Sequence, residues 1–193
     1  MKKIILVLAL ICSNWVHAEQ IKVVASVKPL QLVAQAIVTD IGTAEVLIPA
    51  GASPHHYSLK PSDLTKLNNA DLVLWIGPDM EQFLSKTLKR TSSPVLQLLV
   101  GDDESEHKED SHAKEGDHDG HAHHHGEEDP HLWMDPMHML MAAEKIKNQL
   151  VQFKPESAAV LEKNYETFAA DLLAADQALR QSLLPYQDTG FVV

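Results

Sequence analysis

Four short apolar runs, each separated from the next by a helical pattern, constrain the fold of this chain most strongly. The runs cover residues 21–27, 43–48, 71–76 and 94–100. They are close to continuous, whereas a strand with one face in water alternates apolar and polar side chains. Strands that are buried on both faces and joined through helices form parallel sheets. The pattern therefore predicts an α/β fold, with a four-stranded, mainly parallel sheet flanked by helices in an N-terminal lobe that spans 19–101.

Helical patterns fill the segments between the predicted strands. The first begins at Pro29, which suits the first turn of a helix, and runs to about Asp40. A second is expected to run through Asn68, with Ser62 as its N-cap. A third covers residues 79–89. Together these helices would cover both faces of the sheet.

The second half of the chain is predominantly helical. Residues 136–153 predict one helix, which we assign to the N-terminal lobe as part of the segment 130–154. A second apolar pattern, with spacings of three or four residues, runs from Glu156 to Leu184. At 1.5 Å per residue such a helix would be about 43 Å long. It could link two lobes or form half of an amphipathic hairpin.

We interpret residues 155–185 as a long inter-lobe helix that Pro185 stops. Gly190 and the three apolar residues after it have the pattern of a new buried strand. Domain boundaries normally fall in exposed polar linkers. We therefore expect residues 186–193 to be the start of a second α/β lobe, in a sequence that is cut short.

A strongly acidic, histidine-rich segment covers residues 102–129. It holds seven histidines and twelve carboxylates beside two lysines, which gives it a net charge of −10 out of −11 for the chain. Because few apolar groups are present to offset the entropy of ordering, a disordered loop is expected. Imidazole and carboxylate are ligands that zinc, nickel and copper accept. The segment therefore favours metal handling over a merely solvated linker, through His107, His112, His118, His121, His123, His124 and His125.

Residues 1–18 have the features of a secretory signal peptide. Lys2 and Lys3 precede a nine-residue apolar run over 4–12, and the run is followed by the small-residue pattern Val16-His17-Ala18. A membrane anchor needs about 20 apolar residues, and this run is shorter. We therefore expect an exported protein that is cleaved after Ala18.

The single cysteine, Cys12, lies within this apolar run. A lipoprotein attached at Cys12 is the other possibility, but the bulky Ile11 before it does not resemble the small residue of a lipobox. Cleavage after Ala18 would remove the cysteine and leave no disulfide or thiolate chemistry. Any metal site must then use His, Asp, Glu or water.

Two short motifs place histidines close to the predicted sheet. His55 and His56 follow the second strand, at the carboxyl edge where α/β folds bind ligands. Pro54 biases Ser53 toward an extended backbone. If that extension continues, the two rings would point in opposite directions, so that at most one would face a given cleft. A solvated histidine pair is the alternative.

The second motif contains His131, which stands beside Leu132 and Trp133 at the start of the 136–153 helix. A lone histidine among apolar groups is usually a satisfied core residue. Its position next to the acidic segment favours a metal ligand instead. His138, seven residues further on, is interpreted as a packing or surface residue.

Four motifs in order carry a resemblance to a known family. They are the sequence GASPHHYSLKPSD at 51–63, NADLVLWIGPDME at 69–81, the histidine-rich segment, and HLWMDP at 131–136. Together they resemble the periplasmic zinc-binding proteins of ABC uptake systems, the ZnuA-like members of the metal-binding solute-binding family. The similarity covers essentially the whole chain after the signal peptide.

The resemblance implies a function, a set of ligands and an architecture. The chain would capture Zn²⁺ in the periplasm and deliver it to an ABC permease in the inner membrane, for high-affinity zinc uptake. The first two histidine ligands of the family fall on His55 and His131, and its other ligands lie beyond Val193. Family members have two α/β lobes joined by one long helix. The histidine-rich loop would be an accessory metal site, and it points to zinc over manganese.

The chemistry of such a site sets two further expectations. A histidine ligand must be unprotonated, so the affinity for zinc should fall as the pH drops through about 6.5. With only two of the expected ligands, the chain is not expected to form the high-affinity site of the family by itself. We also expect a monomer.

Other functions remain open at this stage. A periplasmic zinc store or chaperone would act mainly through the loop, and a manganese-type or adhesin relative would share the same fold. A metallohydrolase is disfavoured because the chain has no His-Glu-x-x-His motif, no nucleophile elbow and no paired carboxylates in an apolar context. The chain is therefore not expected to be an enzyme. Outside the acidic segment its charge is close to neutral and no basic patch indicates nucleic-acid binding.

Overall fold

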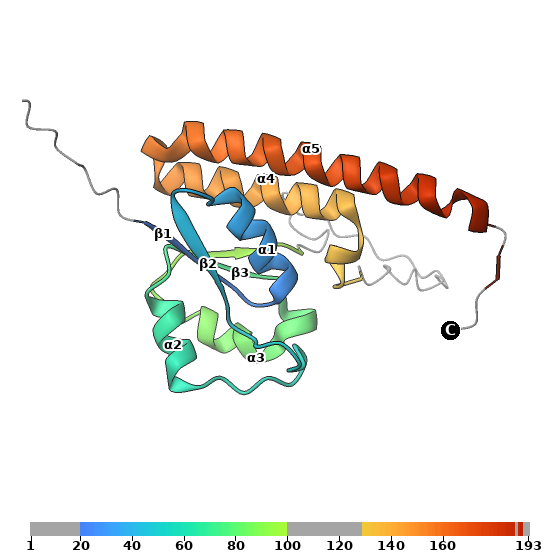
Figure 1. Cartoon of the computed structure of the whole chain (residues 1–193). Coiled ribbons are helices and arrows are strands. Elements are labelled where there is room, and N and C mark those ends of the chain that lie inside the picture. The colour runs from blue at the N-terminus through green and yellow to red at the C-terminus, as the bar shows by residue number, and fades with distance from the viewer. Residues whose placement is uncertain (1–19, 100–128, 188, 191–193) are drawn as a thin grey trace, which may run out of the picture.

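The computed structural model describes residues 20–99, 129–187 and 189–190. Its four strands form one parallel sheet in the order β2-β1-β3-β4, with helices on both faces (Figure 1). This confirms the fold class predicted from the apolar runs. The strands are β1 (Ile21–Ala25), β2 (Gly42–Val46), β3 (Leu72–Trp75) and β4 (Val95–Gln97).

The helices divide between the two faces of the sheet. One face is covered by α1 (Lys28–Ile37), α4 (Pro136–Phe153) and α5 (Ala158–Leu183), and the other by α2 (Pro61–Asn68) and α3 (Pro78–Leu88). Three short 3₁₀ turns complete the described elements: η2 (Leu132–Met134), η3 (Pro155–Ser157) and η4 (Leu184–Tyr186). In Figure 1, α4 and α5 lie side by side above α1, while α2 and α3 lie below the sheet.

Two apolar cores result from the alternation of side chains along the strands. In β3, Leu72 and Leu74 belong to the core under α1, α4 and α5, whereas Val73 and Trp75 belong to the core under α2 and α3. Successive side chains of a strand point to opposite faces, so a strand buried on both sides must be apolar throughout. All four residues of β3 are buried. This is the physical reason for the continuous apolar run.

The residues at the starts of α4 and α2 determine where each helix begins. Helix α4 has the bounds predicted from the sequence, because Pro136 occupies its first turn and the Asp135 Oδ1 accepts a hydrogen bond from the Met137 N–H at 2.8 Å. The prediction that Ser62 caps α2 is wrong. The N-cap position is Lys60, two residues earlier, and the helix begins at Pro61. The Asp63 carboxylate, inside the first turn, accepts a hydrogen bond from the Lys60 N–H at 2.8 Å and takes over the capping role.

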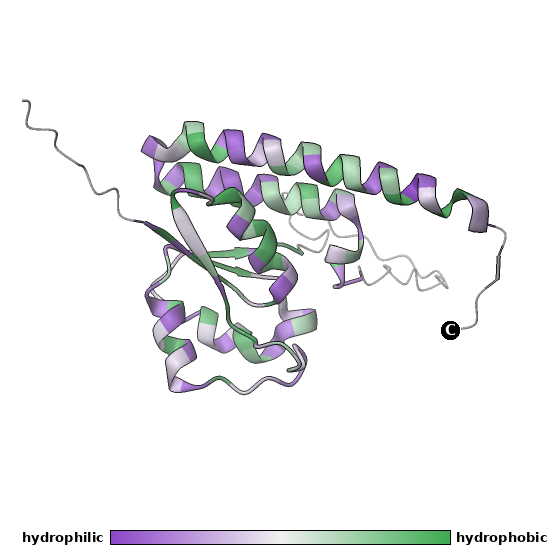
Figure 2. Ribbon diagram, in the orientation of Figure 1, coloured by the Kyte–Doolittle hydropathy of each residue, from purple (hydrophilic) through white to green (hydrophobic). Residues whose placement is uncertain are grey.

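The first half of helix α5 forms a hairpin with α4, which is one of the two arrangements that the sequence left open. Its first half packs against α4 and α1 through Leu161, which is fully buried, followed by Tyr165, Phe168 and Leu172. Its second half extends beyond the α/β body (Figure 1). There Leu179 and Leu183 are more than half exposed, at 58% and 53%. Figure 2 shows α5 alternating between green and purple along its length, as an amphipathic helix does.

Several sequence predictions differ from the structure or fall outside it. The strands are shorter than the apolar runs, most of all β4, which covers three residues. The predicted strand at the end of the chain is not tested, because residues 191–193 lie outside the described residues and Gly190 lies outside any regular element. The signal peptide and residues 100–128 also lie outside them. Among the described helices, none is long and apolar enough to span a membrane.

Candidate metal site

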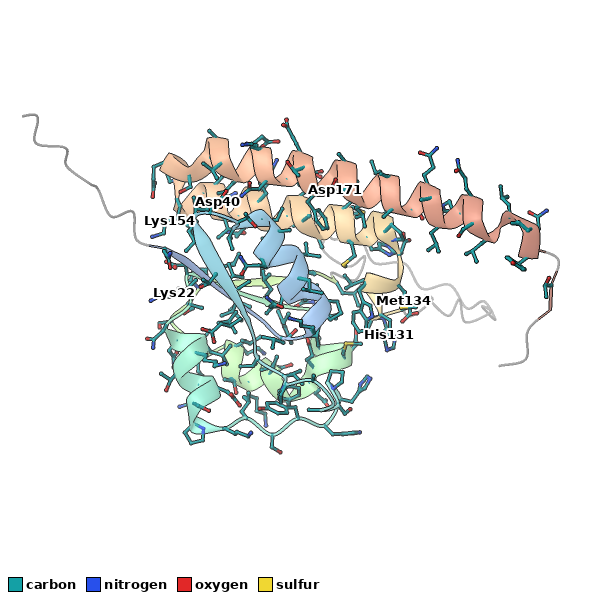
Figure 3. The ribbon with its side chains drawn as sticks, viewed as in Figure 1. Lys22, Asp40, His131, Met134, Lys154 and Asp171 are labelled. Atoms are coloured by element: carbon teal, nitrogen blue, oxygen red, sulfur yellow. The ribbon has the colours of Figure 1, made fainter. Side chains whose placement is uncertain are left out.

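The carboxyl ends of all four strands lie at one edge of the sheet, because every pairing is parallel. The segment that follows β2 carries His55, and His131 directly precedes the η2 turn that leads into α4. In Figure 3, His131 and Met134 lie on the side of the α/β body opposite Lys22 and Lys154. Lys22 is in the amino-terminal half of β1, so His131 lies toward the carboxyl edge. Ligand sites of open α/β sheets occupy this edge.

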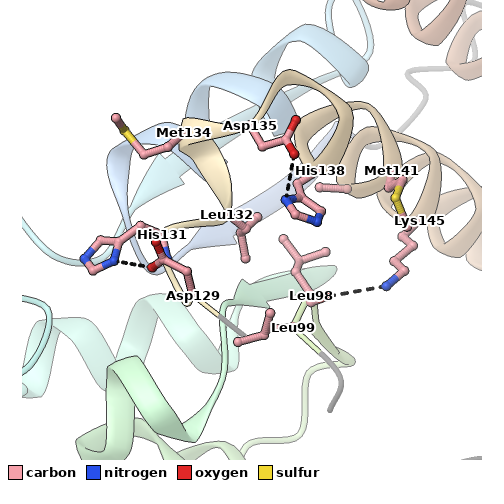
Figure 4. A pocket seen from close by; sticks show the side chains of 11 residues that line it. Leu98, Leu99, Asp129, His131, Leu132, Met134, Asp135, His138, Met141 and Lys145 are labelled. Carbon is pink, nitrogen blue, oxygen red and sulfur yellow. Dashed lines mark hydrogen bonds and ion pairs between the residues drawn. The ribbon is translucent and has the colours of Figure 1, made fainter. Parts of the chain in front are cut away.

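A pocket of about 500 Å³ lies at this edge and is shown in Figure 4. Its walls combine aliphatic side chains with two Asp-His pairs. It is lined by Leu98, Leu99, Asp129, His131, Leu132, Met134, Asp135, His138, Met141, Ala142 and Lys145. The pocket therefore lies between the end of β4, the η2 turn and the first half of α4.

The imidazole of His131 is held by its neighbours on two sides. Its Nδ1 lies 2.7 Å from the Asp129 Oδ1, and the same oxygen accepts a hydrogen bond from the His131 backbone N–H at 2.9 Å. The ring also meets the Trp133 ring edge-on, with centroids 5.2 Å apart. Its side chain is 47% exposed, so the imidazole is accessible to a ligand from solvent. The sequence predicted that His131 stands beside large apolar groups. In the structure, the ring contacts Trp133 and is otherwise partly open to solvent.

The backbone hydrogen bond from His131 is the largest cause that lowers the pKa of Asp129, and the bond from the imidazole adds to it. Asp129 therefore stays ionised near neutral pH and acts only as an acceptor. The sequence placed Asp129 at the end of the acidic loop. In the structure it belongs to the surroundings of His131.

The backbone at His55 turns and does not continue the extension predicted from Pro54. The His55 N–H lies 3.3 Å from the Ser53 Oγ, and the His56 N–H donates to the Ser53 carbonyl at 3.3 Å. Serine side chains commonly form such turns with the N–H two residues on. Both histidines are exposed, and their ring centroids are 6.3 Å apart. The premise that opposite strand faces would separate the two rings is therefore wrong.

Tyr57 connects the His55 segment to the helical layer beneath the sheet. Its hydroxyl donates to the Asp63 Oδ2 at 3.0 Å, and its ring packs edge-on against Phe83 of α3 at 5.9 Å. Burial and the nearby Asp63 carboxylate raise the pKa of the Tyr57 hydroxyl. The hydroxyl stays protonated near neutral pH and continues to donate, which anchors the chain two residues after His55.

A buried carboxylate lies at the same edge of the sheet. Glu81 of α3 is fully buried, and its Oε2 accepts hydrogen bonds from the N–H groups of Ile76 at 2.8 Å and Gly77 at 3.3 Å. Burial raises the pKa of Glu81, against the opposing effects of Ser26, Ile76 and Gly77. This group holds the turn between β3 and α3. The sequence reasoning did not single it out.

Of the two predicted ligands, His55 and His131, only His131 lines the pocket. His131 and His138 line one pocket, although in Figure 4 the His131 ring points away from His138. His138 lies on the surface, as predicted, with its Nδ1 3.4 Å from the Asp135 Oδ2. His55 is not among the residues that line this pocket. Within the described ranges, no three His, Cys, Asp or Glu side chains gather closely enough to hold a metal ion. The seven histidines of the acidic segment lie outside the described residues.

Residues 23–193 match the sequence profile of ZnuA, described as zinc-uptake complex component A, periplasmic. The chain belongs to the ZnuA family. The high-affinity zinc uptake system protein ZnuA of Yersinia pestis is 35% identical over 208 residues, and that of Haemophilus ducreyi is 36% identical over 206. These alignments cover 100% and 98% of the chain, which spans 65% of the length of each relative.

Solved structures share the fold. The Zn(II)-bound ZnuA-like domain of AdcA from Streptococcus pneumoniae has a TM-score of 0.64 over 83% of this chain and 54% of its own, at 22% identity. The metal-dependent lipoprotein YcdH from Bacillus subtilis has a TM-score of 0.66 over 84% of this chain and 55% of its own, at 25% identity. The α/β arrangement described above is thus the one found in ZnuA-like metal-binding proteins.

Proposed function

We propose that this ZnuA-family chain acts in the periplasm as a zinc-binding protein that captures Zn²⁺ and delivers it to an ABC permease in the inner membrane. The observation that carries the proposal is the placement of His131. Its imidazole is accessible at a pocket on the carboxyl edge of a parallel sheet, within the region that matches the family profile. The ZnuA relatives from Yersinia pestis and Haemophilus ducreyi are named for high-affinity zinc uptake.

We assign His55 and His131 as zinc ligands. The His55 segment follows the carboxyl end of β2, His131 lines a pocket with Leu98 and Leu99 just after β4, and both histidines are exposed. Neutral imidazole binds Zn²⁺ at about 2.0–2.1 Å, and four ligands normally complete the coordination. A zinc ion bound by two histidines therefore needs further ligands. The curated relatives are longer than this chain, and we propose that a second lobe supplies the remaining ligands.

The second half of α5 supports a two-lobed arrangement. Leu179 and Leu183 of α5, and Leu184 and Tyr186 of the following η4 turn, are each more than half exposed. An apolar face of this kind normally packs against another element. We assign residues 155–185 as the link between lobes and 186–193 as the start of the second lobe.

The histidine-rich segment is proposed to be an accessory that collects or buffers zinc beside His131. We expect it to bind each ion more weakly than a preorganised cleft does. A dedicated zinc store is the alternative, because seven histidines within one segment could hold several ions. Stoichiometry separates the two functions, since a store binds several ions weakly whereas a transport receptor binds one tightly.

The test uses chromosomal alleles in cells grown at limiting zinc. We expect His131→Ala and His55→Ala to lower zinc-65 accumulation strongly, and added zinc to restore growth. His56→Ala is the matched control, because His56 is the exposed neighbour of His55. Normal zinc-65 accumulation in the His131→Ala strain would overturn the assignment.

A second allele separates the receptor from the store. Excision of residues 102–128 must leave Asp129 in place, because Asp129 contacts His131. We expect this allele to bind fewer zinc ions per molecule and to show reduced uptake at limiting zinc only. If uptake were abolished at every zinc concentration, the hypothesis of a zinc store that acts through this segment would replace the hypothesis of a transport receptor.

The mass of the exported protein tests cleavage after Ala18.

A further inference from the structure

One oxygen of Asp129 serves two different groups of His131. The backbone N–H donates to Oδ1 at 2.9 Å, and the ring Nδ1 lies 2.7 Å from the same atom. An ionised carboxylate can only accept hydrogen bonds. The ring nitrogen that faces it therefore carries a hydrogen, and in the neutral imidazole the lone pair is then on Nε2.

We propose that Asp129 is a positioning residue, which selects the Nδ1–H tautomer of His131 and presents the unprotonated Nε2 to the metal. This inference rests on the proposed role of His131 as a zinc ligand. In metal sites generally, the free N–H of a ligating histidine donates to a carboxylate or carbonyl, which fixes the tautomer and makes the ring more basic. The Asp129–His131 pair has this arrangement.

The local chain explains why two residues so close in sequence can make both contacts. Pro130 stands between them and fixes its own φ, and an aspartate readily accepts a hydrogen bond from the N–H two residues on. The contact of the His131 ring with the edge of Trp133, at an interplanar angle of 76°, restrains the ring from another side. In Figure 4 the imidazole extends outward from Asp129, so its far side is accessible.

The pocket contains a natural comparison for this pair. His138 also faces a carboxylate with its Nδ1, but the Asp135 Oδ2 lies at 3.4 Å, beyond the 2.7–2.9 Å typical of a strong charge-assisted hydrogen bond. Asp135 instead caps α4 through its other oxygen. The same residue types in the same pocket thus form one tight pair and one loose pair. Asp135→Asn keeps a good N-cap and is a matched control for Asp129→Asn.

The first measurement needs no metal. Nitrogen-15 NMR of the histidine rings, in the full metal-free chain at a pH well above the ordinary histidine pKa of about 6.5, reports which ring nitrogen carries the hydrogen. We expect His131 to be the Nδ1–H tautomer. Asp129→Ala should shift it toward the Nε2–H tautomer that free histidine favours in water. A wild-type His131 that is mainly Nε2–H would overturn the proposal.

The second measurement is a zinc titration followed at the His131 ring signals, which separates this position from the histidines of 102–128. We expect Asp129→Asn to weaken zinc binding at His131 about 10-fold and Asp129→Ala up to about 100-fold. The amide of Asn keeps an acceptor for the backbone N–H, so this variant removes the charge without removing that bond. Asp135→Asn should leave the affinity unchanged.

The outcomes distinguish this inference from the proposed function. If zinc leaves the His131 signals unchanged in the wild-type chain, the ligand assignment fails while the tautomer result stands by itself. If zinc binds at His131 with equal affinity in wild type, Asp129→Asn and Asp129→Ala, the positioning role of Asp129 fails and the ligand assignment survives. Equal losses in Asp129→Asn and Asp135→Asn would also overturn the role, because they would indicate a general effect of removing charge from the pocket.

Discussion

Asn164 of α5 donates a hydrogen bond of 3.0 Å to the carbonyl oxygen of Ile37, the last residue of α1. The same amide donates to the Thr39 carbonyl at 2.9 Å. The last carbonyls of a helix have no partner within the helix, so one side chain satisfies two groups at the end of α1. These bonds join α5 to an element 127 residues earlier in the chain.

Replacing Asn164 by alanine should therefore loosen α5 from the α/β body. We expect a loss of about 1–2 kcal/mol in the free energy of unfolding, since the partly buried Ile37 carbonyl and the exposed Thr39 carbonyl lose their donor. Urea unfolding measures it. Gln149→Ala is the control, because that amide makes only an exposed contact with Gln152. Equal stabilities of the two variants would contradict the expectation.

Gly42 begins β2 at a position where the neighbouring strand leaves no room for a side chain. A Cβ added there would clash with the Ile21 carbonyl oxygen and lie 2.9 Å from the Ile21 Cβ. Because both partners belong to the sheet, neither can move without disturbing the pairing of β1 with β2. We expect Gly42→Ala to cost about 1–3 kcal/mol in the free energy of unfolding. Gly190→Ala, where the added Cβ meets nothing within 4 Å, should have little effect.

Leu161 is the apolar anchor of α5, fully buried in the core shared with α1 and α4. Leu161→Ala should cost about 2–5 kcal/mol, the usual range for a leucine truncated in a packed core. Leu179→Ala, on the same helix but 58% exposed, should change the stability by less than about 0.5 kcal/mol. Thermal and urea unfolding provide both values. A small effect at Leu161 would mean that α5 is not docked through this residue.

Glu81 predicts how stability depends on pH. Its pKa is raised in the folded state, mainly by burial, so folding favours the protonated form. The resulting stabilisation is complete below the ordinary glutamate pKa and is lost as the pH rises through the raised value. Glu81→Gln cannot titrate. We therefore expect wild type to lose stability relative to Glu81→Gln as the pH increases from about 4 toward neutrality.

Urea unfolding of both proteins across that pH range is the measurement. The informative quantity is the change with pH in their stability difference, because the amide alters the hydrogen bonds to Ile76 and Gly77 at every pH. A difference that is independent of pH would contradict the raised pKa.

The sequence predicts most elements because burial and capping are local signals. Helix α4 is predicted to the residue, since Asp135 and Pro136 mark its start. The ends of strands are less predictable. An apolar residue indicates that its side chain is buried, but it does not indicate whether its backbone pairs with a neighbouring strand. After β4, Leu98 and Leu99 still donate to the carbonyls of Trp75 and Ile76, although the regular strand has ended. The wrong cap at Ser62 has a similar cause, because Asp63 competes for the same role and only the structure decides between them.

The candidate site is less predictable, since it depends on how turns orient side chains. The motifs point to His55 and His131, but the turn at Ser53 overrides the extension expected from Pro54. The sequence pattern groups Asp129 with the acidic segment. An aspartate followed by proline is, however, a known turn signal, and it could have indicated the contact of Asp129 with His131. The ligand assignments and the domain boundaries stay predictions, because they depend in part on residues that the structure does not describe.

The strand order has a consequence for the time course of folding. β1 lies between β2 and β3, and the bond from the Lys22 N–H to Asp71 beside the β1–β3 pairing closes a separation of 49 residues. Parallel pairings of this kind require long loop closures, which are slow compared with the local contacts of a helical hairpin such as α4 and α5. The carboxyl edge exists only once β1 is in place. If His55 and His131 bind zinc as proposed, the ion should bind late, to a sheet that has already assembled, and should slow unfolding more than it speeds folding.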